Sequence, residues 1–100
     1  MAATLRLQLR VLSGKNCSLC EPVIAAARAA ASARALPAPD VVDVATLPRA
    51  EHEKYRYAIP VVELQLGGGA EPVVLFEPTR RKNLVSCAEL LAAVDARAID

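Results

Sequence analysis

The feature that most constrains this chain is an apolar strand that runs through a short turn into two cysteines and a helix. Residues 11–20 are Val-Leu-Ser-Gly-Lys-Asn-Cys-Ser-Leu-Cys. Leucines alternate with polar residues before the turn, which predicts a strand over residues 5–12. The alanine-rich segment after it predicts a helix from about Ser18 to Ala35. The thiols of Cys17 and Cys20 are therefore predicted to lie at the start of a helix.

One face of this first helix is predicted to be buried, because its apolar residues recur at helical spacing. These residues are Cys20, Val23, Ile24, Ala27 and Ala31. Ser18 and Glu21 have the spacing of a capping box, which would satisfy two backbone N–H groups at the helix start. Pro22 has no backbone N–H, so we expect a kink or a late helix start near it.

The rest of the chain predicts three more strands and two more helices. They are a strand over Val41–Val44, a helix from Thr46 to about Tyr57, strands over Val61–Leu66 and Val73–Phe76, and a last helix after Ser86. Gly67-Gly68-Gly69 supplies the tight reversal between the last two strands. Ser86 and Glu89 form a second capping-box pattern, with Leu90, Leu91 and Val94 facing inward.

The predicted order is βαβαββα. The first two strands are joined through a helix, which implies that they pair in parallel, and the last two form an antiparallel hairpin. The 100 residues contain no repeat and no linker, so we expect a single domain over residues 1–100.

Charge and composition narrow the class of function. A net charge of +1 argues against nucleic-acid binding, and no apolar run reaches the ~20 residues that cross a bilayer. The first strand already begins at Leu5 and leaves no room for a cleavable segment, so we expect no secretion signal and a cytoplasmic or organellar-matrix location. In such a reducing compartment, a close cysteine pair is more often catalytic or metal-binding than structural.

The element order, with Cys17-Ser18-Leu19-Cys20 after the first strand and Ile59-Pro60 before the third, resembles the thioredoxin fold. The closer resemblance is to small glutaredoxin-like proteins, and it covers nearly the whole chain. It implies an α/β fold with a four-stranded mixed sheet flanked by three helices. It also implies that Pro60 is a cis-proline lying against the cysteine pair, and that the chain is a monomeric thiol–disulfide oxidoreductase.

Three features depart from the glutaredoxin pattern. Ser18 stands where these proteins usually have a proline, and Gly14 where they usually have a lysine that binds a glutathione carboxylate. The segment from Glu77 to Lys82 replaces the turn and the acidic residue that hold the glutamyl part of glutathione. We expect no tightly bound cofactor, with glutathione as a candidate reductant. The expected partner is a disulfide-bearing protein or small molecule.

Distinct roles are predicted for the two cysteines. Cys17 lies just ahead of the helix, where free N–H groups and the helix dipole stabilise a thiolate, and Lys15 adds a positive charge. Cys17 is therefore the predicted nucleophile. Cys20 lies one turn further on, on the buried face, and is the predicted resolving cysteine that attacks a mixed disulfide from within.

Other residues are predicted either to bind the substrate or to have a structural role. Ile59 and Pro60 would leave backbone free to pair with an extended substrate. Arg80 is assigned to substrate binding, in a basic loop with Arg81 and Lys82 that is either an anion clamp or a solvated loop. Cys87, directly after a helix N-cap, is interpreted as mainly structural. His52 is expected at the surface, and Tyr55 and Tyr57 are expected to pack the second helix onto the sheet.

Two other functions use the same thiols. A copper carrier would hold its metal between Cys17 and Cys20, but copper chaperones have the order βαββαβ. A related variant of the fold binds an iron–sulfur cluster between two subunits with glutathione, and no metal site is assigned here. A zinc site that adds His52 and Cys87 lacks a second closely spaced pair. A non-catalytic binding module with a vestigial dithiol is the remaining alternative, and the altered glutathione elements keep it open.

Overall fold

The computed structural model describes residues 7–15, 17–55, 58–67 and 71–98. The elements in chain order are β1 (Gln8–Ser13), α1 (Cys20–Ala33), β2 (Asp40–Asp43), the 3-10 helix η1 (Val44–Thr46), α2 (Arg49–Tyr55), β3 (Val61–Gln65), β4 (Val73–Phe76) and α3 (Cys87–Ala98). The predicted order βαβαββα is confirmed, with η1 as an addition. Residues 5 and 6 of the first predicted strand lie outside the described residues.

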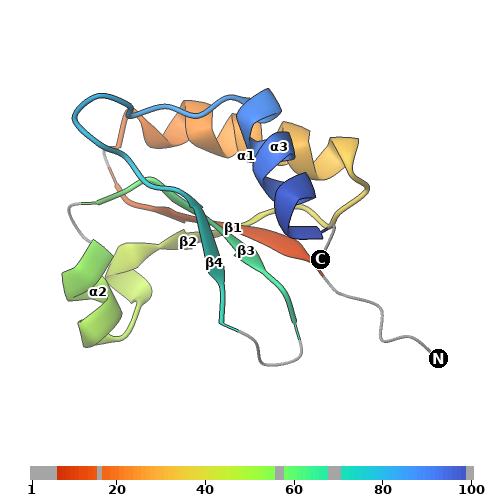
Figure 1. Cartoon of the computed structure of the whole chain (residues 1–100). Coiled ribbons are helices and arrows are strands. Elements are labelled where there is room, and N and C mark those ends of the chain that lie inside the picture. The colour runs from red at the N-terminus through yellow and green to blue at the C-terminus, as the bar shows by residue number, and fades with distance from the viewer. Residues whose placement is uncertain (1–6, 16, 56–57, 68–70, 99–100) are drawn as a thin grey trace.

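The four strands form one sheet in the order β2-β1-β3-β4. β1 pairs with β2 in parallel and β3 pairs with β4 in an antiparallel hairpin, as the sequence predicted. The structure adds an antiparallel pairing of β1 with β3. Helices α1 and α3 lie together over one face of the sheet, and α2 lies on the other side (Figure 1). The mixed sheet flanked by three helices is therefore confirmed.

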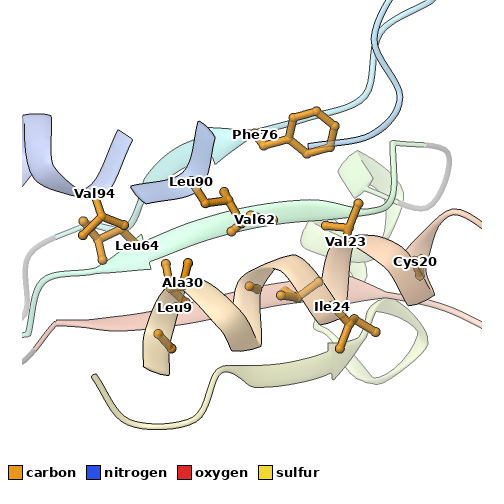
Figure 2. Close-up of a cluster of buried hydrophobic side chains, with 13 residues drawn as sticks. Leu9, Cys20, Val23, Ile24, Ala30, Val62, Leu64, Phe76, Leu90 and Val94 are labelled. Atoms are coloured by element: carbon orange, nitrogen blue, oxygen red, sulfur yellow. The ribbon is translucent and has the colours of Figure 1, made fainter. Parts of the chain in front are cut away.

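Strand alternation divides the core between these two faces. On the side of α1 and α3, residues from both helices and from three strands form the larger cluster, in which Leu9, Leu64 and Leu90 are fully buried (Figure 2). All five residues of the predicted stripe of α1 are buried in it: Cys20, Val23, Ile24, Ala27 and Ala31. On the side of α2, Leu12, Val44 and Val61 form a smaller cluster against which Tyr55 packs, as predicted.

A charged pair with a buried carboxylate lies beside the smaller cluster. Arg10 and Glu63 face one another across β1 and β3, and Nε and Nη2 of Arg10 donate to Oε1 of Glu63 at 2.8 and 2.6 Å. Glu63 is only 3% exposed. This contact compensates the cost of burying the carboxylate, because the acceptor is both hydrogen-bonded and ion-paired.

The start of α1 differs from its prediction. The helix begins at Cys20 with Leu19 as N-cap, and among the described residues no side chain caps it. The predicted capping box of Ser18 and Glu21 is therefore wrong, and the predicted late start is confirmed. With Ser18 as N-cap, the N–H that closes the first helical hydrogen bond would belong to Pro22, which has none. With Leu19 as N-cap, Pro22 falls in the first turn, where that N–H is not needed.

The start of α2 is also later than predicted. Residues Val44–Thr46 form η1 instead, and the Asp43 carboxylate accepts a hydrogen bond of 2.9 Å from the N–H of Ala45. Leu47 is extended, because a residue before proline is disfavoured from the helical region. The helix therefore begins at Arg49, after Pro48.

The capping box of α3 is confirmed. The N–H of Ser86 donates to Oε1 of Glu89 and the N–H of Glu89 donates to Oγ of Ser86, both at 3.1 Å. Leu90 and Val94 are buried below it, and Leu91 packs against the same cluster.

Candidate redox site

The two cysteines of the motif lie between the end of β1 and the first turn of α1. They are joined in a disulfide, with their Cα atoms 5.3 Å apart. The N–H of Cys20 donates a hydrogen bond of 3.2 Å to the carbonyl oxygen of Cys17, which closes the turn between them. A separation of three residues at a helix start therefore brings the sulfurs together without disturbing the helix.

The two sulfurs differ in their surroundings. Cys20, the first residue of α1, is 2% exposed and belongs to the larger core cluster (Figure 2). Cys17 is half-buried and packs against the edge of that cluster. An open hollow of about 470 Å³ at this place is lined by Ser13, Gly14, Cys17, Ser18, Cys20 and Glu21. An incoming group therefore meets Cys17 at the surface, with Cys20 behind it.

The start of α1 supports the chemistry of this pair. Because the N-cap is Leu19, no side chain satisfies the N–H groups of the first turn in the described part of the chain. Ser18 is exposed and takes no part in a cap. The N–H of Glu21, which has no side-chain acceptor in the described part of the chain, and the helix dipole both favour a thiolate just ahead of α1.

Gly14 and Ile59 bring two distant segments into contact at the site. A Cβ atom at Gly14 would lie 2.7 Å from Cδ1 of Ile59, which is closer than such atoms approach. Ile59 packs against both core clusters, so its side chain is held from two sides. A side chain at position 14 would therefore have to displace Ile59.

Pro60 lies at the same end of the sheet. It is fully buried, and the Ile59–Pro60 peptide bond is cis. Val61, the next residue, pairs with Leu12 of β1, one residue before Ser13 of the hollow. Strand pairing thus places the Ile59–Pro60 segment beside the turn that carries Cys17.

Lys15 and Arg80 do not line the hollow at Cys17. Lys15 is exposed and lines a neighbouring hollow of about 210 Å³ with Ser13, Gly14, Val41 and Asp43. Arg80 belongs to the loop between β4 and α3. That loop reaches the end of the molecule where α1 begins (Figure 1). The N–H of Thr79 donates to the carbonyl of Lys82 at 2.7 Å, and Arg80 and Arg81 are exposed between these residues.

The remaining sequence candidates lie away from the pair. Cys87 is a half-buried free thiol and the first residue of α3, as predicted. His52 is half-buried rather than at the surface, and its Nδ1 lies 3.0 Å from the carbonyl oxygen of Val44. Tyr57 lies outside the described residues. Within the described ranges, no three His, Cys, Asp or Glu side chains gather to hold a metal, and no helix is long and apolar enough to cross a membrane.

Glu21 belongs to the site, although its place in the sequence predicted only a capping role for it. It lines the hollow together with Cys17. Its position four residues after Cys17, about one helical turn, is the signal that could have identified it. The contact between Gly14 and Ile59 joins residues 45 positions apart, and no local pattern in the sequence indicates it.

Two solved structures have the same arrangement of elements. Thioredoxin 1 from Thermosipho africanus TCF52B is 16% identical and superposes with a TM-score of 0.61, over 92% of this chain and 94% of its own. XcR50 from X. campestris, a structural-genomics target protein, is 20% identical, with a TM-score of 0.58 over 88% of this chain and 96% of its own.

The chain has the thioredoxin fold. The fold predicted from the Cys-x-x-Cys motif and the Ile59-Pro60 dipeptide is thereby confirmed. Neither a family model nor a curated protein matches the sequence. At these identities the likeness concerns the thioredoxin fold alone, so the reaction has to be argued from the cysteine pair itself.

Proposed function

We propose that this protein is a small thiol–disulfide oxidoreductase that uses Cys17 as nucleophile and Cys20 as resolving cysteine. The observation that carries the proposal is the Cys17–Cys20 disulfide at the uncapped start of α1, with one sulfur at the rim of a hollow and the other in the core. A thiolate forms more readily at such a helix end, and thiol–disulfide exchange proceeds through the thiolate.

The reaction has two exchange steps. In the reduced protein, the Cys17 thiolate attacks one sulfur of a substrate disulfide, forms a mixed disulfide with it and releases the other sulfur as a thiolate that takes up a proton. Cys20 then loses its proton and attacks the sulfur of Cys17. The Cys17–Cys20 disulfide forms and the second substrate thiolate leaves. Two electrons have passed to the substrate, and a thiol or dithiol reductant returns the protein to its starting state.

The surroundings suggest how a substrate is held. Ile59 and Pro60 lie beside the turn of Cys17, and we propose that the backbone there pairs with an extended segment of the substrate. Arg80, exposed at the same end of the sheet, is proposed to contact acidic groups of a protein partner, and Lys15 to contact the substrate from the neighbouring hollow. A disulfide-bearing protein is the proposed partner, and glutathione remains a candidate reductant.

The decisive experiment compares Cys17→Ser with Cys87→Ser in the reduction of a peptide disulfide by a dithiol. Cys17→Ser should reduce the rate to that of the uncatalysed reaction, whereas Cys87→Ser, which removes a thiol outside the site, should keep the wild-type rate. Circular dichroism checks that both variants are folded. Wild-type activity in Cys17→Ser would show that the assignment is wrong.

A second variant separates the two roles. Cys20→Ser leaves the nucleophile but removes the resolving thiol, so the protein should accumulate as a mixed disulfide with the peptide, visible as a mass increase that a reductant reverses. If a folded wild-type protein reduces no disulfide and Cys20→Ser forms no mixed disulfide, the chain is better explained as a non-catalytic binding module.

A further inference from the structure

The hollow at Cys17 has an acidic wall. Among the described residues that line it, Glu21 is the one that carries a charge at neutral pH in the oxidised protein. Glu21 belongs to the first turn of α1 and is exposed. It forms no ion pair with another described residue, so its charge faces the solvent and whatever enters the hollow.

The basic residues of this end of the molecule are arranged differently. Lys15 lines the neighbouring hollow, which also contains Asp43. Arg80 and Arg81 lie in the turn after β4, and neither lines the hollow at Cys17. A group that enters the hollow therefore meets the side chain of Glu21, which lines it, whereas the arginines lie outside that lining.

The charge of Glu21 should affect which substrate disulfides react with Cys17. Charges near the surface interact most strongly at short range, because salt screens them beyond about 10 Å at 0.1 M ionic strength. A basic side chain next to the attacked cysteine would be attracted to Glu21, and a carboxylate in the same place would be repelled. Oxidised glutathione carries carboxylates close to its disulfide, so it falls into the second group.

We propose that Glu21 is a specificity residue that directs the protein toward disulfides flanked by lysine or arginine and away from those flanked by carboxylates. This inference rests on the proposed oxidoreductase function and adds its substrate class. Glu21 takes no part in the exchange steps, and the bonds formed and broken are those already described.

The test uses two peptide disulfides that differ only in the residues beside the cysteine, two lysines in one peptide and two glutamates in the other. In 50 mM salt the ratio of kcat/KM, lysine peptide over glutamate peptide, should be about three- to fivefold, as expected for exposed charge pairs. Glu21→Gln should bring the ratio close to one, and Glu21→Lys should invert it. Any effect of residue 21 on the nucleophilicity of Cys17 changes both rates equally and cancels in the ratio.

The matched control is Glu71→Gln, which removes the same charge at the hairpin end of β4, opposite to the end of the sheet that carries Cys17. It should keep the wild-type ratio. A wild-type ratio of one, a preference for the glutamate peptide, or an unchanged ratio in Glu21→Lys would each overturn the inference while leaving the oxidoreductase function intact. If Cys17→Ser reduces both peptides as fast as the wild type, the proposed function fails and the inference fails with it.

Discussion

Helices α1 and α3 both begin with a cysteine, but their first turns are built in opposite ways. In α3, Ser86 and Glu89 cap one another, and the N–H of Leu90 donates to the carbonyl of Ser86 at 3.1 Å. In α1, the N-cap is Leu19 and no described side chain binds the first turn. At the α3 start, the Ser86 and Glu89 side chains accept hydrogen bonds from backbone N–H groups and so stabilise the helix. The α1 start has no such cap beside its cysteine pair. The N–H of Cys20 donates to the carbonyl of Cys17 and Pro22 has no N–H, so the N–H of Glu21 is the one left without a side-chain acceptor among the described residues.

A single residue accounts for this difference. Each segment has a serine followed three residues later by a glutamate, Ser18 and Glu21 in one and Ser86 and Glu89 in the other. Both therefore have the sequence pattern of a capping box. The next position is Leu90 in one and Pro22 in the other. Leucine donates the N–H that closes the first helical hydrogen bond, and proline has none. Pro22 therefore moves the start of α1 by one residue and leaves Ser18 outside it.

The largest effect expected from this comparison is a difference in the free energy of unfolding between variants of Ser86 and Ser18. Ser86→Ala should lower the free energy of unfolding by about 1 kcal/mol, because it removes a side-chain acceptor for a first-turn N–H. Ser18→Ala should change it by less than about 0.5 kcal/mol, as for an exposed residue without such a bond. Urea denaturation of the two variants with the disulfide intact measures both values. Equal losses would mean that Ser18 caps α1 after all.

A smaller effect is expected from pH. The ion pair with Lys82, 2.6 Å between Nζ and Oε2, and the hydrogen bond from the N–H of Ser86 hold the pKa of Glu89 below its ordinary value. A carboxyl whose pKa is lowered by folding contributes stability above its unfolded pKa, and this contribution is lost as the pH falls through the folded pKa.

Glu89→Gln should therefore have a slightly lower Tm than the wild type at pH 7, and the difference should shrink below about pH 4.5, the ordinary value of the group. Because Gln still accepts the hydrogen bond from Ser86, the comparison isolates the charge. The effect is small since both side chains are exposed. A Tm difference that grows in acid would contradict the assignment of the pair.

Much of the fold could be predicted because its causes are local. The helical spacing of Cys20, Val23, Ile24 and Ala27 identified the buried face of α1, and the bounds of β4 follow from a short apolar run between polar loops. The late start of α1 was also indicated by Pro22. Such features depend on residues within one or two turns of each other, so the sequence displays them directly.

The parts that escaped prediction depend on residues far apart in the chain. Glu63 alternates with the apolar residues of β3, yet it is only 3% exposed and is paired with the partly buried Arg10, 53 residues earlier. The position of Ile59 against Gly14 likewise requires the pairing of β1 with β3. The reactive pair could be located from the sequence, but the walls of its hollow could not.

The measurement that tests the central claim most directly is the rate of alkylation of Cys17 against pH in the reduced protein, quantified peptide by peptide by mass spectrometry. The reference is the same chain unfolded in urea, where a thiol titrates near its ordinary pKa of about 8.5. Because the open start of α1 stabilises the thiolate, the pKa of Cys17 in the folded protein should lie at least about one unit lower. A midpoint at or above that of the unfolded chain would contradict this account of the site.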